Sequence, residues 1–155
     1  MDFFRDHLLS IITYTPLLGA LLLLLPPFRN NDNGVRWFAN AVGLLGFLVS
    51  LPLWFAFDRQ AEGFQYIERH EWIPSIGVSY YFGVDGLSAL LILMTTLLGF
   101  IAILSSWTAV TERVRQYYVF LLLLQTGMIG VFCALDVFLF YVFWEVMLLP
   151  MYFLI

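Results

Sequence analysis

The chain has 155 residues and a formal net charge of −4, and 62% of its residues are hydrophobic whereas 12% are charged. Because soluble domains are only about 45–50% apolar, this composition predicts an integral membrane protein, and about five spans of about 20 residues leave no room for a soluble catalytic domain. The acids lie in the polar segments and no basic cluster is present, which excludes nucleic acid as a partner and leaves the lipid bilayer.

Two hydrophobic stretches near the N-terminus predict the first two membrane helices. Residues 7–25 are mostly apolar and end at two prolines, and residues 37–57 are again apolar. Between them, residues 28–36 are rich in Asn, Asp and Gly, which favour turns. One stripe of the second helix consists of small residues, as is typical of close helix packing in lipid: Ala39, Gly43, Gly46 and Ser50.

Residues 58–84 form the one long polar segment, and they lack a helical pattern. Apolar and polar residues tend to alternate from Phe64 to Trp72, as in a half-buried strand. A turn is expected near Pro74, and residues 78–82 predict a second strand. We therefore expect a β-hairpin in the loop between the second and third helices.

Three further apolar stretches predict membrane helices over residues 86–107, 117–134 and 137–155. An aspartate precedes two of them, Asp85 before the first and Asp136 before the last. A carboxylate at this position accepts hydrogen bonds from the free N–H groups of the first helical turn, so we predict structural capping roles for both residues. A role in an ion path is the alternative for Asp85. The fold class predicted is an all-α membrane protein of about five helices with a hairpin in one loop, forming a single membrane domain.

A few polar side chains lie inside the predicted spans. Thr95 and Thr96 are near the centre of the third helix, and Gln125 is deep in the fourth. Threonines in membrane helices usually bond back to the preceding turn, so this bland interpretation stands beside a polar path through the bundle. Gln125 needs a partner inside the bundle, because an unpaired amide is costly in lipid. The fourth helix also has a stripe of small residues: Gly127, Gly130 and Ala134.

The last predicted helix carries one carboxylate near its middle, Glu145. A charge at membrane depth costs about 2.5–3.5 kcal/mol, so we expect this side chain to be buried in a protein-lined or watery interior. Burial favours the neutral acid, which suits a group that transfers protons near neutral pH. Pro150 has no N–H, and we expect it to leave a carbonyl free near Val146 and to bend the helix. The alternative is a glutamate held in an inert hydrogen bond between helices.

Other kinds of site are excluded by what the sequence lacks. Cys133 is the single cysteine, so it forms no internal disulfide and alone makes no metal site, and packing is its expected role. His7 and His70 lie at a helix start and in the hairpin, where they cannot hold a haem between spans. No P-loop or dinucleotide-binding glycine motif is present. We predict no cofactor-binding or metal site in this chain.

Arginine placement predicts the orientation of the helices in the membrane. Cytoplasmic or matrix-facing loops carry an excess of basic residues, and short loops weigh most. The two short links contain Arg29, Arg36, Arg113 and Arg115, whereas the N-terminal tail and the hairpin segment contain Arg5, Arg59 and Arg69 among more acids. We therefore expect the short links on the cytoplasmic or matrix side and the hairpin on the opposite side.

Two runs carry a resemblance to a known family. Tyr80–Phe100 and Leu135–Ile155 resemble the third and fifth helices of the subunit M (chain 4) type of proton-pumping NADH-quinone oxidoreductase, respiratory complex I. The FWE-x-x-L-x-P core around Glu145 is the more diagnostic of the two. The resemblance covers essentially the whole chain. It implies an antiporter-like membrane-arm subunit, in which the glutamate matching Glu145 works in a proton half-channel with lysines on later helices, coupled to distant quinone reduction.

The resemblance also implies the setting of the chain. NADH, FMN, iron–sulfur clusters and quinone are expected in other subunits of the enzyme complex, and the partners are the other membrane-arm subunits. The location implied is the bacterial inner membrane or, alternatively, the mitochondrial inner membrane. The chain contains no lysine and no second repeat, so we expect it to be an incomplete chain.

Two other functions stay open at this point. The chain is also similar to the homologous subunit of a multi-subunit cation/proton antiporter or of a membrane-bound hydrogenase. In the remaining alternative it is a non-conducting membrane scaffold, in which Glu145 only ties helices together.

Overall fold

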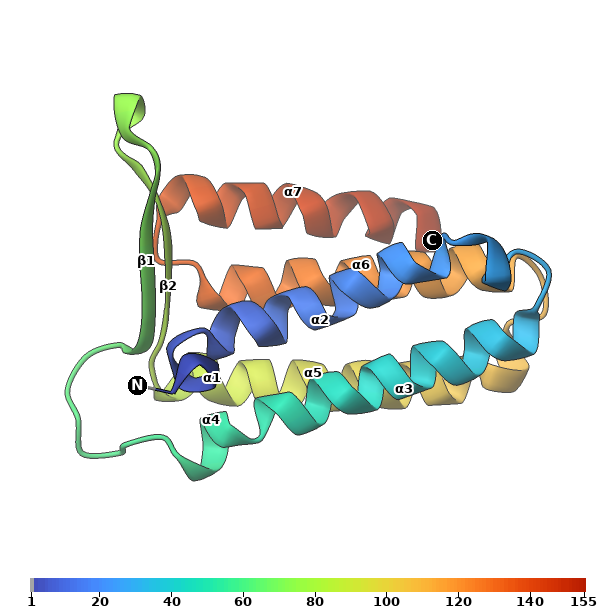
Figure 1. Cartoon of the computed structure of the whole chain (residues 1–155), viewed down its shortest axis with the longest axis horizontal. Coiled ribbons are helices and arrows are strands. Elements are labelled where there is room, and N and C mark those ends of the chain that lie inside the picture. The colour runs from blue at the N-terminus through green and yellow to red at the C-terminus, as the bar shows by residue number, and fades with distance from the viewer. Residues whose placement is uncertain (1) are drawn as a thin grey trace.

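The structure is a computed structural model that describes residues 2–155, and it consists of helices lying side by side with a β-hairpin across one end (Figure 1). The elements follow in this order: α1 (Phe3–Asp6), α2 (Leu8–Leu23), η1 (Pro26–Phe28), α3 (Asp32–Ser50), α4 (Pro52–Phe55), β1 (Gln65–Ile73), η2 (Pro74–Ile76), β2 (Val78–Val84), α5 (Gly86–Ala109), α6 (Val114–Cys133) and α7 (Val137–Leu154).

Four helical spans in the described residues are long and apolar enough to cross a membrane. They are α3 together with α4, then α5, α6 and α7, and α2 is a shorter apolar helix of 16 residues. The β1–β2 hairpin lies between α4 and α5, where the alternating pattern predicts it. The predicted fold class, a helical membrane protein with a hairpin in one loop, is confirmed.

The second span begins five residues earlier than its hydrophobic pattern predicts, at Asp32. The Asn31 side chain accepts a hydrogen bond of 2.9 Å from the N–H of Gly34, so it caps the helix and part of the polar link forms the first turn. The same span is interrupted at Leu51, since the ring of Pro52 removes a donor from the helical ladder and α4 starts there.

The hairpin is antiparallel, with His70 opposite Tyr80. A register irregularity falls between Gln65 and Glu68, where Tyr66 adopts a left-handed backbone with φ of 55°. A bulge of this kind re-aims the side chains that follow it. Glu68 is the residue of β1 that is buried in the protein interior.

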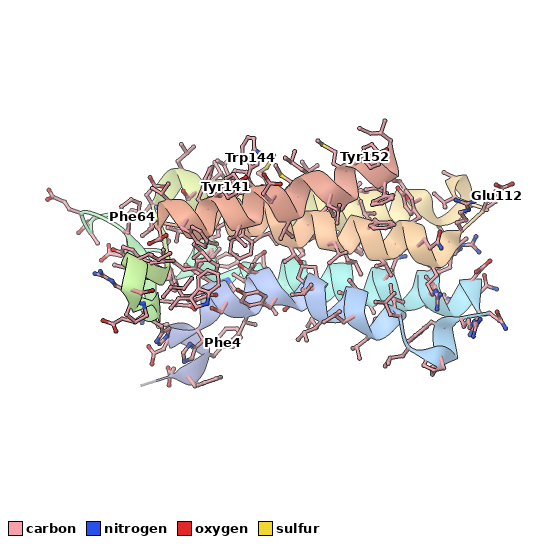
Figure 2. All side chains as sticks on the ribbon, turned by 90° about the horizontal axis from the view of Figure 1, so that it is seen from above. Phe4, Phe64, Glu112, Tyr141, Trp144 and Tyr152 are labelled. Carbon is pink, nitrogen blue, oxygen red and sulfur yellow. The ribbon has the colours of Figure 1, made fainter. Side chains whose placement is uncertain are left out.

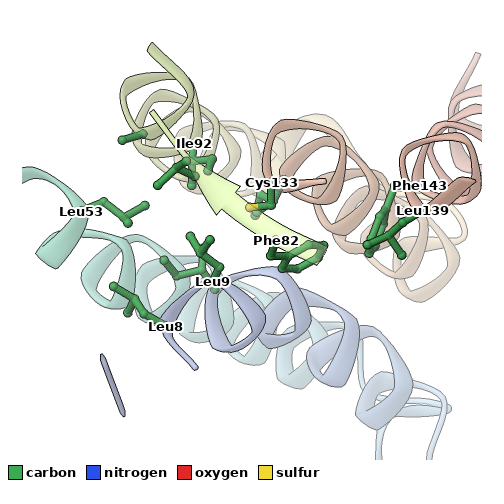
Figure 3. Close-up of a cluster of buried hydrophobic side chains, with 12 residues drawn as sticks. Leu8, Leu9, Leu53, Phe82, Ile92, Cys133, Leu139 and Phe143 are labelled. Atoms are coloured by element: carbon green, nitrogen blue, oxygen red, sulfur yellow. The ribbon is translucent and has the colours of Figure 1, made fainter. Parts of the chain in front are cut away.

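The last part of β2 is inserted among the helix ends. The N–H of Leu135, in the link between α6 and α7, donates a 2.8 Å hydrogen bond to the carbonyl of Tyr81. The Phe82 side chain is fully buried, and Figure 3 shows it between Leu9 of α2 and Cys133 of α6. This packing fixes the hairpin on the bundle rather than leaving it as a free loop.

All connections gather at two ends of the bundle (Figure 1). The hairpin, α1 and the α6–α7 link lie at one end, and η1 and the α5–α6 link lie at the other. The short links with Arg29, Arg36, Arg113 and Arg115 therefore share one end, as the predicted orientation requires.

Candidate functional site

Glu145 lies at mid-length of α7, on the side of the helix that faces away from the other helices. The side chain is exposed. Tyr141, one turn earlier and 58% exposed, places its phenol beside the Glu145 carboxylate. Figure 2 looks onto α7 from outside the bundle and labels Tyr141, Trp144 and Tyr152 along this surface. We call the exposed residues Tyr141, Glu145, Leu149 and Tyr152 the outer face of α7.

Residues 2–155 do not by themselves form the protein-lined or watery interior in which we expect Glu145 to lie. The residues of α7 that are buried are Leu139, Phe143 and Pro150, and they lie on another side of the helix. The hydrophobic pattern does not distinguish the sides of α7, because this helix is apolar all round. Pro150 is within the helix, which continues through it to Leu154.

Of the two threonines near the centre of α5, Thr96 points into the bundle and Thr95 is only partly buried. The Thr96 hydroxyl lies 2.8 Å from the Ser50 hydroxyl of α3 and therefore links two helices. The Thr95 hydroxyl donates to the carbonyl of Leu91, one turn earlier. The Thr96 hydroxyl also donates to the carbonyl of Leu93 at 2.9 Å, so both threonines bond back to the preceding turn, and Thr96 adds a polar contact inside the bundle.

Gln125 of α6 is 2% exposed and packs against the backbone of α5 at Gly99. A Cβ atom at Gly99 would come within 2.8 Å of the Gln125 amide, so the glycine makes room for this side chain. The Oε1 atom is buried without a hydrogen-bond partner among the described residues. A buried amide oxygen of this kind is a place where a proton donor or a water molecule is favoured.

Asp85 and Asp136 each accept hydrogen bonds from a helix N-terminus. Asp85 accepts from the N–H of Ser88 at 2.7 Å, and Asp136 accepts from the N–H groups of Phe138 and Leu139 at 2.9 and 3.2 Å. Hydrogen bonds to the carboxylate favour the ionised form. The N–H of Ser79, together with the helix N–H groups, holds the pKa of Asp136 below the ordinary value, and the bonds from Ser88 do the same for Asp85.

The sequence analysis missed a buried carboxylate in the hairpin, that of Glu68. This side chain is 3% exposed and contacts Ser10 of α2, which in turn contacts the Tyr80 hydroxyl of β2. The alternation of β1 does not single out Glu68, because register irregularities fall on both sides of it, between Gln65 and Glu68 and between Glu71 and Ile73. Its partner Ser10 is 58 residues away in sequence, so no local pattern identified the contact.

The described residues place carboxylates at two depths, Glu68 at the hairpin end and Glu145 near the middle of α7. No group of three His, Cys, Asp or Glu side chains comes together in residues 2–155 as a metal site requires. Cys133 is free and buried. The chemistry available to this arrangement is proton binding and release by carboxyl and hydroxyl groups.

Sequence comparison finds one family over most of the chain. Residues 16–132 match the family described as NADH-ubiquinone oxidoreductase chain 4, amino terminus. The chain is 41% identical over 148 residues to the NAD(P)H-quinone oxidoreductase chain 4 3 of Picosynechococcus sp., covering 95% of this chain and 26% of the relative. It is 41% identical over 153 residues to the NADH-quinone oxidoreductase subunit M of Rhodobacter capsulatus, covering 97% and 29%. The chain thus spans less than a third of the length of these relatives.

Two solved structures share the fold at lower sequence identity. The membrane-bound sulfane sulfur reductase, an archaeal respiratory membrane complex, matches with a TM-score of 0.75 and 20% identity, over 94% of this chain and 22% of that chain. The Mrp complex from Dietzia sp. matches with a TM-score of 0.65 and 22% identity, over 96% of this chain and 15% of that chain. At these identities the likeness concerns the fold of a multi-pass membrane protein.

Proposed function

Because the chain belongs to the family of NADH-ubiquinone oxidoreductase chain 4, represented by its amino-terminal part, we propose that it works as a membrane-arm subunit of a proton-translocating NADH:quinone oxidoreductase. Glu145 is the group that carries the proton in this proposal. NADH, FMN, iron–sulfur clusters and quinone belong to other subunits, and the bacterial inner membrane is the proposed location, with the mitochondrial inner membrane as the alternative.

The observation that carries the proposal is a carboxylate at mid-length of a membrane helix, on a surface that nothing in residues 2–155 covers. An ionised carboxylate facing lipid costs about 2.5–3.5 kcal/mol, so the outer face of α7 is stable when protein covers it. We propose that a membrane-arm helix carrying a lysine packs here, as the family resemblance implies. The interface then buries Glu145.

Such an interface explains how Glu145 exchanges protons. Burial among helices favours the neutral acid, whereas a cation brought close favours the carboxylate. A lysine that moves toward and away from Glu145 therefore switches the site between its empty and loaded forms. Tyr141 is the neighbouring hydroxyl on α7, one turn before Glu145.

A second candidate is the homologous subunit of a cation/proton antiporter or of a membrane-bound hydrogenase. The fold likeness to the sulfane sulfur reductase and Mrp complexes favours it as the alternative. Both functions use Glu145 in the same way and differ in the subunits with which the chain assembles. Identification of the subunits that co-purify with the chain separates them.

The test is Glu145→Gln in the complete complex, because the amide keeps the shape of the side chain and cannot ionise. We expect proton pumping and quinone reductase activity to fall by about an order of magnitude or more. The matched control is Glu112→Gln, which neutralises an exposed carboxylate in the α5–α6 link (Figure 2) and leaves both activities near wild type. A scaffold role predicts wild-type pumping and reductase activity in both variants.

A further inference from the structure

Glu68 is a buried carboxylate with an unusual set of partners. Its side chain is 3% exposed, although it belongs to the hairpin. One carboxylate oxygen accepts a 3.1 Å hydrogen bond from the backbone N–H of Ser10, and the other accepts from the Ser10 hydroxyl. The Ser10 hydroxyl is also 2.7 Å from the Tyr80 hydroxyl. Carboxylate, serine and phenol thus form one continuous hydrogen-bonded row.

We propose that Glu68, Ser10 and Tyr80 form a proton-exchange site at the hairpin end of the bundle, with Glu68 as the group that holds the proton. The evidence for this site is the set of contacts that Glu68 makes. A contribution of the site to proton pumping depends on the proposed function, whereas the presence of the site does not.

The hydrogen-bonding groups of the row keep their partners in both protonation states of Glu68. When Glu68 is ionised, the Tyr80 hydroxyl donates to Ser10 and the Ser10 hydroxyl donates to the carboxylate. When a proton reaches the Tyr80 oxygen from water, the Tyr80 proton moves to Ser10 and the Ser10 proton moves to Glu68. One O–H bond forms and one breaks at each hydroxyl, and the row ends with Glu68 neutral and donating to Ser10. No heavy atom has to move, so the exchange is reversible.

The hydrogen-bond donors to the Glu68 carboxylate are neutral groups. No cationic side chain in residues 2–155 donates a hydrogen bond to it. Around the row, α1 carries the exposed Arg5 and Asp6, and β1 carries Arg69 and His70. His7 precedes α2, which contributes Tyr14, and α6 contributes the buried thiol of Cys133. The Arg69 guanidinium is engaged over the Tyr81 ring, at 5.0 Å from its centroid.

A purely structural role is the competing explanation. Ser10 is in the first turn of α2, and the preceding His7 makes no side-chain cap, so the Glu68 carboxylate also caps this helix from the hairpin. A cap of this kind needs only the ionised form and only the N–H of Ser10. The additional hydrogen bond from the Ser10 hydroxyl, and its extension to Tyr80, go beyond what a cap requires.

Tyr80 joins the row to the rest of the molecule. Burial raises the pKa of Tyr80 well above its ordinary value, so the phenol stays protonated and passes protons as a hydroxyl. Tyr80 also lines a cavity of ≈ 580 Å³ together with Tyr14 of α2 and Thr126 of α6. On the other side, the His70 ring lies 6.4 Å from both the Tyr80 ring and the His7 ring, measured between centroids. The row therefore lies between the surface of the hairpin and the interior of the bundle.

The test is infrared spectroscopy of the purified complete complex during a pH titration. The signal is the C=O stretching band of a protonated carboxyl that is present in wild type and absent from Glu68→Gln. Glu62→Gln, which removes an exposed carboxylate in the loop before β1, is the control and should keep the band. Ser10→Ala and Tyr80→Phe break the row at its second and third members, and we expect each to move the band midpoint by about one pH unit.

The outcomes separate the possibilities. A pH-dependent band that Glu68→Gln removes and that Ser10→Ala and Tyr80→Phe displace supports the site. Absence of any difference between wild type and Glu68→Gln across the pH range of the assembled complex overturns it. If Glu68→Gln does not assemble, an identical titration in wild type, Ser10→Ala and Tyr80→Phe overturns it equally. Normal pumping in Glu145→Gln contradicts the proposed function and leaves this band unaffected.

Discussion

A single aspartate joins α7 to the hairpin. One Asp136 oxygen accepts from the N–H groups of Phe138 and Leu139, and the other accepts from the N–H of Ser79 in β2 at 3.2 Å. The carboxylate therefore caps α7 and at the same time fixes the start of this helix to β2. Its hydrogen bonds hold the pKa of Asp136 below the ordinary value.

We predict that Asp136→Ala lowers the stability of the protein by about 1–2 kcal/mol, as is typical for loss of a helix cap. Thermal unfolding in detergent measures this loss of stability. The folded-state pKa is depressed, so the stabilisation is present above the ordinary aspartate pKa and is lost as the pH falls through the folded value. The difference between wild type and variant should therefore shrink on acidification. Asp6→Ala, which removes an exposed carboxylate, is the control, and an equal loss there would contradict the assignment.

At this scale, the sequence reveals residues whose partners are local. Asp85 and Asp136 are recognisable because they precede apolar runs and bond to the turn that follows. Glu68 is not recognisable in this way, because Ser10 comes from a distant helix. The position of Glu145 along α7 is predictable, but the direction of its side chain is not, since all sides of α7 are apolar.

The helices α6 and α7 come close to each other at the small residues of α6. A Cβ atom at Gly127 would come within 2.9 Å of the backbone N and Cα of Met147, and one at Gly130 would meet the ring of Phe143. Close backbone approach of this kind is how membrane helices associate, because lipid supplies no hydrophobic driving force between them. The small stripe on α6 therefore holds α7 in the orientation that directs Glu145 outward.

We predict that Gly127→Ala displaces α7, because the backbone of Met147 cannot yield as a side chain would. The expected loss is about 1–3 kcal/mol, the usual cost of overpacking. Thermal unfolding and the yield of assembled complex measure it. The matched control is Gly46→Ala in α3, where an added Cβ has no heavy atom within 4 Å and stability should stay near wild type. Equal stability of both variants would show that the packing of α7 against α6 does not depend on the contact at Gly127.

The positions of helices and strands are predictable from the sequence, whereas their packing partners are not. Helix positions follow from apolar run length, and the hairpin follows from alternation, so both are predictable. Both small stripes are visible in the sequence, but only the structure distinguishes Gly127, which has a close neighbour, from Gly46, which has open space. Neighbour choice depends on the whole packed bundle, which no single segment encodes.

For the whole molecule, the main consequence of the fold is a membrane helix with one packed side and one uncovered side. The packed side of α7 contacts α6 and β2, whereas Tyr141, Leu149 and Tyr152 surround Glu145 on the outer face. The chain covers 26% to 30% of the length of four of its relatives, and we propose that membrane-arm protein covers this face. The outer face of α7 should then be buried in the assembled complex.

Cysteine labelling at Leu149 tests this claim most directly. Leu149 is 61% exposed one turn beyond Glu145, and the chain's own Cys133 is buried and gives little background. The Leu149→Cys variant is treated with a lipid-soluble maleimide in the intact complex and again after detergent has separated the subunits. We expect the labelling rate to be about tenfold lower in the intact complex than in the separated subunits, because the thiol then lies inside a packed interface. Equal labelling rates in the two preparations would contradict it.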